Sequence, residues 1–417
     1  MTFRDFGDLA ISAATKRALS EVGFTTPTPV QQQAIPPAMS GRDVIACAAT
    51  GTGKTAAFVL PMTERLSGRT GVVGLMLAPT RELALQLAEH AKPFAFAHSL
   101  SVVTLIGGVD IDAQIDSLAH ANLVVATPGR LVDHLKRGSV SLAGIEVLVL
   151  DEADRMLDMG FKPQLTRILA RLPKKRQTML FSATMASEVE EFAKTALRDP
   201  VRVEVSLSGT TAAGASQVIY EVTKAEKNPL LLTLLIEVPG ARTLVFCRTR
   251  RRAEKLMKTL QRERYPVVQM HAERSQAQRQ YALDGFRSGR YQVLLTTDIT
   301  ARGIDVANIE HVINYDAPFV AEDYVHRIGR TARAQATGRA STFVTDEDEA
   351  IVAAIEKLTR APLTRAPVPR DDPEFIKAVA DEKARQADPG PQEKKDPDAP
   401  VKPMGRHART HPKKKKT

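Results

Sequence analysis

Short apolar runs alternate with amphipathic stretches along most of the chain. The first series of runs is VIAC ending at Cys47, LMLA at Ala78, LVVA at Ala126, VLVL at Leu150 and MLF at Phe181. The second series is LVFC ending at Cys247, VVQM at Met270, VLL at Leu295 and HVINY at Tyr315. Runs of this length separated by helical stretches predict an α/β fold, in which helices cover both faces of a parallel sheet.

Two series of strands predict two domains. Residues 206–216, SLSGTTAAGAS, separate the series with small and polar residues that have no periodicity, which is typical of a linker. We therefore expect one domain over residues 1–208, a second over 217–365, and a flexible tail over 366–417.

Charge is concentrated at the C-terminal end. The chain of 417 residues carries a net charge of +10, and residues 391–417 contain nine Lys or Arg against three Asp or Glu. This segment has few large apolar residues, so we expect it to be disordered. Two readings remain open: a solubility tail, and a tether for nucleic acid.

The cysteines and the hydropathy of the chain indicate its cellular compartment. Cys47 and Cys247 lie 200 residues apart in apolar runs, which disfavours a disulfide framework and a zinc site. The N-terminus lacks the apolar stretch of a signal peptide, and no run of 18 uncharged apolar residues occurs. We expect no membrane association and a cytoplasmic location.

Polar clusters follow five strands of the first series. They are AATGTGKT (48–55), PTRELA (79–84), TPGR (127–130), DEAD (151–154) and SAT (182–184). Because ligands of open α/β sheets bind beyond the carboxyl ends of the strands, the five clusters predict one site.

AATGTGKT predicts a phosphate-binding loop. Gly51 and Gly53 let backbone N–H groups turn toward a phosphate, Lys54 supplies an ammonium, and Thr55 offers a hydroxyl to Mg²⁺. The strict pattern has Gly at position 48, where this chain has Ala. The alternative is a glycine-rich turn with an incidental lysine.

The acidic cluster gains a role once a nucleotide is present. Asp151 is placed to hold Mg²⁺ through water, and Glu152 to orient and deprotonate the attacking water. A solvated acidic turn is the alternative.

In the second half, Arg327, Arg330 and Arg333 of HRIGRTAR recur at helical spacing and should share one face. That face is either an arginine finger for phosphoryl transfer or a solvated basic surface.

These motifs resemble those of a DEAD-box ATP-dependent RNA helicase of superfamily 2, and the overall run resembles the bacterial RhlE type. The resemblance covers about residues 3–365. It implies two tandem RecA-like domains that close on ATP and single-stranded RNA. Departures are Ala332 and Gln335, where the family usually has Gly, and Thr300, where a smaller residue is usual.

The resemblance also implies roles for individual residues. Gln31 pairs with the adenine edge and Phe6 packs on the base; Ser182 and Thr184 hydrogen-bond to the DEAD carboxylates; and Arg330 and Arg333 reach the γ-phosphate. The implied ATP-binding residues are Phe6, Gln31, Ala49, Thr50, Gly51, Thr52, Gly53, Lys54, Thr55, Gly303 and Asp305. The implied coupling residues are Asp154, Ser182, Thr184 and His326. The implied RNA-binding residues are Pro79, Thr80, Arg81, Gly107, Gly108, Thr127, Gly129, Arg130 and Thr297.

The predicted activity is RNA-dependent ATP hydrolysis that unwinds short duplexes locally and remodels RNA or ribonucleoprotein. The expected cofactors are ATP and Mg²⁺. RNA is the expected partner, with ribosomal precursors or RNA-decay complexes as further candidates, and a monomeric core is expected. One alternative is an ATP-gated RNA clamp or annealing module. A DNA helicase is disfavoured by the resemblance alone, because phosphate contacts do not by themselves distinguish RNA from DNA.

Overall fold

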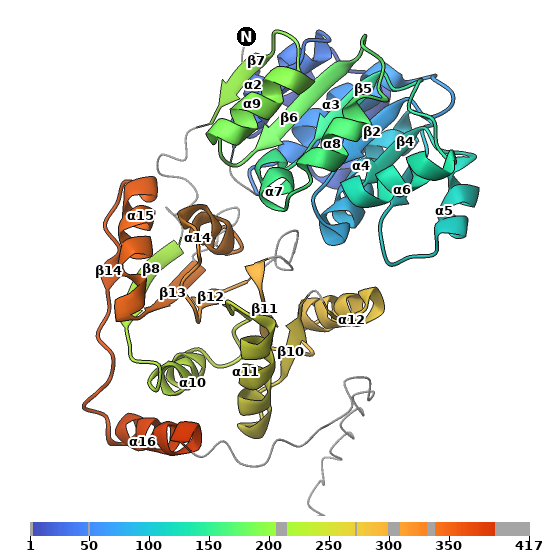
Figure 1. Ribbon diagram of the computed structural model, residues 1–417. Coiled ribbons are helices and arrows are strands. Elements are labelled where there is room, and N and C mark those ends of the chain that lie inside the picture. The colour runs from blue at the N-terminus through green and yellow to red at the C-terminus, as the bar shows by residue number, and fades with distance from the viewer. Residues whose placement is uncertain are drawn as a thin grey trace, which may run out of the picture.

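Two parallel β-sheets, each covered by helices, make up the described part of the chain (Figure 1). The computed structural model describes residues 3–48, 51–205, 215–271, 273–298, 309–331 and 338–387. Within these ranges each sheet has seven strands, and every strand pairing is parallel. The expected α/β architecture with two domains is therefore confirmed.

The first sheet has the strand order β3-β4-β2-β5-β6-β1-β7. Its strands are β1 (Val44–Cys47), β2 (Gly74–Leu77), β3 (Val102–Leu105), β4 (Leu123–Ala126), β5 (Val147–Leu150), β6 (Gln177–Ser182) and β7 (Val201–Glu204). The helices of this domain are η1 (Phe6–Asp8), α1 (Ala13–Val22), α2 (Pro29–Met39), α3 (Lys54–Leu66), α4 (Arg81–Ala97), α5 (Ile111–Leu118), α6 (Pro128–Arg137), α7 (Ala153–Asp158), α8 (Lys162–Leu169) and α9 (Ser187–Ala196).

The second sheet has the order β10-β11-β9-β12-β13-β8-β14. Its strands are β8 (Ala215–Glu221), β9 (Thr243–Phe246), β10 (Val267–Met270), β11 (Val293–Thr296), β12 (His311–Asn314), β13 (Gly338–Val344) and β14 (Thr364–Arg365). The described helices are α10 (Lys227–Glu237), α11 (Arg250–Arg262), α12 (Gln276–Arg287), α14 (Ala321–Ile328), η2 (Asp346–Asp348), α15 (Glu349–Thr359) and α16 (Pro373–Ala387).

Local sequence explains these elements. β5 is buried at all four positions, as expected for an apolar strand with helices on both faces. Alternate residues of the central strands enter separate cores, with Val149 in one and Leu148 in the other. α6 follows Thr127 in extended conformation, starts with Pro128, and stops at Gly138, whose φ of 69° favours glycine.

Five strands were not predicted from the sequence: β3, β7, β8, β13 and β14. β3 and β7 lie at the edges of the first sheet and are partly exposed, so their runs are less apolar. β13 contains small and polar residues, GRASTFV, although it is almost entirely buried. β14 is only two residues long.

The predicted start of the flexible tail at residue 366 is wrong. Helix α16 packs against α10, with Phe375 5% exposed in the core of the second domain. The Asn228 amide donates to Glu382 Oε1 at 2.8 Å, and Arg370 Nε donates to Glu226 at 2.8 Å.

Residues 388–417 lie outside the described ranges. So do linker residues 206–214, whereas Ala215, within the predicted linker, already begins β8.

Among the residues that the structure describes, none of the helices has the length and apolar character needed to cross a membrane.

Candidate nucleotide site and the surface beside it

The five predicted polar clusters follow five adjacent strands, in the order β4-β2-β5-β6-β1. Because these strands are parallel and in register, their carboxyl ends form one continuous edge. The loops after them therefore gather at a single site, as the sequence predicts.

The loop before α3 has the backbone of a phosphate-binding turn. Gly51 and Gly53 have φ values of 81° and 86°, which favour glycine, and Gly53 is the N-cap of α3. Lys54 is 7% exposed, and its Nζ donates to the Ala48 carbonyl oxygen at 2.9 Å. Thr55 lies in the first turn of α3. Ala49 and Thr50 lie outside the described residues.

The predicted adenine-reading glutamine contacts this loop directly. Gln31 is 1% exposed; its Nε2 donates to the Gly53 carbonyl oxygen at 3.0 Å, and its Oε1 accepts from Thr28 N–H at 2.9 Å. Phe6 is buried, with its ring 5.8 Å from that of Phe3. The side chain of Gln31 thus joins the upstream segment to the phosphate-binding loop.

The carboxylates after β5 are buried. Asp151, Glu152 and Asp154 are each 5% exposed. Burial raises the pKa of the Asp151 carboxyl to about 7, and the neighbouring Glu152 acts in the same direction, whereas Lys54 opposes the shift. Buried acids at one strand end fit a site that receives a cation.

Glu152 is held by an arginine that the sequence analysis did not single out. It is the N-cap of α7 with a φ of 53°, and Arg155 Nη1 donates to its Oε2 at 2.6 Å. Burial alone would raise the pKa of Glu152, but Arg155, Lys54 and Arg330 together lower it. The available sequence signal was the three-residue spacing on one short helix.

Asp154 joins β6 to the acidic cluster. Its Oδ2 accepts from Ala183 N–H at 3.0 Å, from Thr184 N–H at 2.9 Å and from the Thr184 hydroxyl at 3.2 Å. The Ser182 hydroxyl accepts from the backbone N–H of Asp154 at 3.3 Å, so Ser182 contacts the DEAD segment through its backbone, and its predicted bond to a carboxylate stays a prediction. Ser182 is the last residue of β6 and is fully buried, which places its hydroxyl against the first turn of α7.

The predicted common face of the second-domain arginines is also wrong. α14 ends at Ile328 and is capped by Gly329, so Arg330 follows the helix instead of continuing its face. Arg327 is 1% exposed and binds Asp298 through two bonds of 2.6 and 2.7 Å, with its guanidinium 4.9 Å from the Phe246 ring centre. Arg327 therefore stabilises its own domain.

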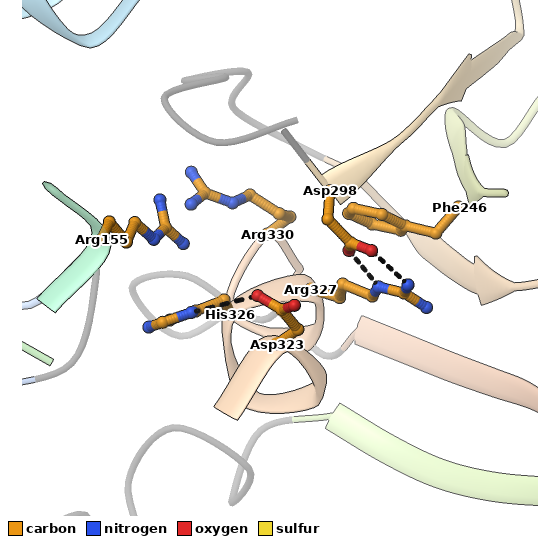
Figure 2. Close-up of a pocket in the computed structure, with 7 residues that line it drawn as sticks. All are labelled: Arg155, Phe246, Asp298, Asp323, His326, Arg327 and Arg330. Atoms are coloured by element: carbon orange, nitrogen blue, oxygen red, sulfur yellow. Dashed lines mark hydrogen bonds and ion pairs between the residues drawn. The ribbon is translucent and has the colours of Figure 1, made fainter. Parts of the chain in front are cut away.

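Arg330 instead faces the first domain. Figure 2 shows Arg155 and Arg330 reaching toward the same space, with His326 below them and Arg327 turned away to Asp298. Burial lowers the pKa of His326, with Arg155 adding to the effect. Residues from both domains line this pocket: Arg155, Phe246, Asp298, Asp323, His326, Arg327 and Arg330. Gly303, Asp305 and Arg333, with Thr300, Ala332 and Gln335, lie outside the described residues.

Three of the predicted RNA motifs meet at one loop. An added Cβ at Gly107 would lie 3.0 Å from Arg81 Nη2, and one at Gly108 would overlap the same guanidinium. Arg130 Nη2 donates to the Val109 carbonyl oxygen at 2.6 Å. Both arginines therefore lie against the backbone of residues 107–109.

The other predicted RNA residues lie on the loops around that cluster. Thr80 caps α4 by accepting from Leu83 N–H at 3.3 Å, next to Pro79. Thr127 donates its N–H to the Leu105 carbonyl oxygen at 3.1 Å, and Gly129 is in the first turn of α6. Thr297 follows β11 in the second domain.

One ion pair joins the domains away from the acidic cluster. Arg279 Nη2 of α12 lies 2.7 Å from Glu82 Oε2 of α4, and both side chains are buried. Sequence reasoning missed this pair, because the two residues are almost 200 positions apart and each is ordinary in its own helix.

The donor set fits a nucleotide with Mg²⁺ better than a metal held by protein alone. Among the described residues, no group of three or more His, Cys, Asp or Glu is arranged to hold a metal ion. Mg²⁺ in phosphoryl-transfer sites commonly takes one or two protein ligands, with water and phosphate oxygens completing the shell. Asp151 and Thr55 are the residues that would hold it here.

Comparison with known proteins agrees with this geometry. The DEAD/DEAH box helicase family model matches residues 28–192, and the helicase conserved C-terminal domain model matches residues 226–335. The DEAD-box ATP-dependent RNA helicase CshA of Bacillus subtilis is 39% identical over 374 residues, which cover 89% of this chain and 75% of that protein. The ATP-dependent rRNA helicase RRP3 of Scheffersomyces stipitis is 39% identical over 370 residues, covering 88% and 76%.

A solved structure shows the same two-domain arrangement. Saccharomyces cerevisiae Dbp5 bound to RNA and ADP BeF3 is similar with a TM-score of 0.82 and 31% identity, over 91% of this chain and 100% of that one. Two family models, relatives that share most of their length, and a matching fold lead to one conclusion: this chain belongs to the DEAD-box ATP-dependent RNA helicase family.

Proposed function

We propose that the protein hydrolyses ATP in response to RNA and uses the cycle to separate short RNA duplexes locally and to remodel RNA or ribonucleoprotein. The observation that carries the proposal is the approach of Arg330, from the second domain, to the buried acidic cluster of the first. A site completed by both domains ties hydrolysis to domain closure. The relatives are named as RNA helicases and Dbp5 has been solved with bound RNA, which supports RNA as the partner.

Each side chain has a task in this reaction. Lys54 would exchange its bond to the Ala48 carbonyl for a phosphate oxygen, and the N-terminus of α3 would face the same group. Glu152 orients the attacking water and takes its proton, and Arg330 offsets the charge that develops on the transferred phosphoryl group. Bound Mg²⁺, held by Asp151 and Thr55, would neutralise phosphate charge.

Coupling to RNA runs through Asp154. The Asp154 carboxylate accepts hydrogen bonds from the backbone N–H and the hydroxyl of Thr184. It also lies close enough to His326 for the imidazole to help lower the pKa of Asp154 against the effect of burial. A change in the acidic cluster would therefore reach both β6 and the second domain. Arg81 and Arg130, fixed on the 107–109 loop, would hold RNA phosphates without reading bases.

The proposal also assigns a type, further partners and a location. The RhlE type rests on the overall run of motifs. A role with ribosomal precursor RNA is supported by the name of the rRNA helicase relative. RNA-decay complexes, a monomeric core and a cytoplasmic location complete the proposal; the two unpaired cysteines suit a reducing compartment.

Matched RNA and DNA substrates test the proposed function. ATPase and strand-separation rates should rise with RNA and much less with DNA of the same sequence. Equal stimulation by DNA would contradict the RNA assignment. RNA-stimulated turnover without strand separation would favour the alternative of an ATP-gated clamp.

Gly108→Ala should weaken RNA binding and leave ATP binding near its parent value. Gly108 has a φ of 74°, where a side chain costs about 1–2 kcal/mol. Its Cβ would also displace Arg81. We expect about a tenfold loss of RNA affinity, equivalent to about 1.4 kcal/mol, measured by fluorescence anisotropy.

Gly138→Ala is the matched control for that substitution. Gly138 has a φ of 69°, but a Cβ there would meet no atom within 4 Å. The control shares the backbone strain and lacks the clash, so its RNA affinity should stay near that of the parent protein. Equal losses in the two variants would show that strain, and not Arg81, governs the effect.

Deletion of residues 391–417 should affect RNA capture and not maximal turnover. The deletion removes nine cationic side chains, and it starts after the last residue of α16, Ala387. Each lost contact with a single-stranded phosphate should flatten the dependence of log affinity on log salt by about 0.7. Half-saturating RNA for ATPase activity, measured at several salt concentrations, checks this. Parallel salt dependences would indicate a solubility or protein-docking segment.

A further inference from the structure

Helix α11 carries an exposed row of cations on the outside of the second domain. Arg251, Lys255, Lys258 and Arg262 recur every three or four residues, so they share one face, and all four are exposed. The opposite face is buried through Ala253, Leu256 and Leu260. We call the four cations the α11 stripe.

The charge of this region is unusual for the chain. Residues 248–264 contain eight Lys or Arg and two Glu, a balance of +6, and residues 391–417 have the same balance. Since the whole chain is +10, everything outside these two segments is close to neutral, at −2. The basic character is therefore local, and general solubility does not explain its placement.

The stripe also lacks the acidic partners that solvated helices usually have. In the described part of the chain, Arg251, Lys255 and Lys258 make no ion pair, and Arg262 reaches only its neighbour Glu263 at 3.6 Å. Glu254, the acid nearest in sequence, lies instead 3.7 Å from His271.

Other surface cations of this domain, exposed or half-buried, do have partners. Ion pairs join Lys224 to Glu347, Arg339 to Glu237 and Arg365 to Glu221, at 2.7 to 2.9 Å. The stripe instead sets like charges at i,i+3 and i,i+4, which costs an isolated helix roughly 0.2–0.5 kcal/mol per pair. An anionic partner would remove that cost.

The α11 stripe lies close in sequence to the pocket between the two domains. Phe246, the last residue of β9, lines the pocket between the domains, and α11 begins four residues later. From Arg251 to Arg262 the stripe spans roughly 17 Å at 1.5 Å per residue. Figure 1 shows α11 running along the second domain, where it covers β10 and β11.

We propose that the α11 stripe is an auxiliary RNA-binding surface, which holds the phosphate backbone of an RNA segment that extends beyond the predicted RNA-binding residues. This inference rests on the proposed function, since that function brings RNA to those residues. The four cations would bind successive phosphates. Their side chains are flexible cations and no aromatic residue lies among them, so the contact is independent of sequence.

Charge neutralisation in the full-length protein tests the proposal. The triple variant Arg251→Gln, Lys255→Gln, Lys258→Gln keeps good helix formers at exposed positions. Two RNAs are compared by fluorescence anisotropy over a range of KCl: the shortest oligonucleotide that fully stimulates the ATPase, and the same oligonucleotide extended at either end.

The extended RNA should separate the variant from the parent. For it, the slope of log affinity against log salt should be shallower by about 2, because three phosphate contacts at about 0.7 each are lost. At low salt the affinity should fall roughly 10-fold or more. The short RNA should bind and stimulate both proteins equally.

Two further variants control for charge. Arg251→Lys, Lys255→Arg, Lys258→Arg preserves the stripe and should retain the parent slope. Arg171→Gln, Lys174→Gln, Lys175→Gln removes three exposed cations from the first domain and should change the slope little. Parallel slopes for parent and stripe variant on extended RNA, or an equal loss in the first-domain control, would overturn the proposal. Failure of the parent to respond to any RNA would instead refute the proposed function.

Discussion

Glu152→Gln is expected to slow ATP hydrolysis by roughly 10²- to 10⁴-fold while ATP and RNA still bind. The amide keeps the size of the side chain but cannot accept the proton of the attacking water. The complex with ATP and RNA should therefore accumulate. Single-turnover hydrolysis and anisotropy of labelled RNA in the presence of ATP measure the two effects.

The ion pair with Arg155 makes a control necessary. Glutamine at position 152 leaves the buried Arg155 guanidinium without its anionic partner, and breaking a buried pair can destabilise a protein. Arg155→Met breaks the same pair but keeps the Glu152 carboxyl. Because Arg155 helps to hold the pKa of Glu152 low, hydrolysis lost in this variant should recover as the pH is raised, whereas that of Glu152→Gln should not. If Arg155→Met stayed as slow as Glu152→Gln at high pH, or if Glu152→Gln hydrolysed ATP at near the parent rate, Glu152 would not be the base.

Arg330→Ala is expected to lower turnover by on the order of 10³-fold or more, with a much smaller change in nucleotide affinity. Arg330 approaches Glu152 from the second domain, and it is 5% exposed in the pocket lined by both domains. Its loss removes positive charge where the transferred phosphoryl group becomes more negative. Steady-state ATPase assays at saturating RNA, with nucleotide binding measured separately, give the comparison.

Arg327 and an isolated first domain provide the controls. Arg327→Ala removes the bonds to Asp298 and the contact with Phe246, so it should lower the melting temperature of the second domain. A fragment of residues 1–208, which includes β7, should hydrolyse ATP only slowly. Rapid hydrolysis by this fragment would show that the reaction needs no charge from the second domain.

Local signals accounted for much of the fold and of the first-domain site. Apolar runs predicted the central strands, because a parallel strand covered on both faces needs continuous apolar residues. The glycines at 51 and 53 predicted the loop before α3, because their positive φ angles are local requirements. Edge strands such as β3 and β7 were not predicted, since a partly exposed strand can contain polar residues and then lacks a continuous apolar run.

The sequence alone therefore determined the α/β class, the two domains and the gathering of five polar clusters at one sheet edge, since strand periodicity and turn chemistry act over a few residues. The family resemblance assigned Arg330 to the γ-phosphate, but only the tertiary structure supplied the physical reason why Arg330, and not Arg327, faces the nucleotide site. Arg327 and Arg330 look equivalent in HRIGRTAR, yet Gly329 ends the helix between them and Asp298, far away in sequence, binds Arg327. The Glu82–Arg279 contact and the docking of α16 likewise depend on packing between segments, and no local pattern reports such contacts.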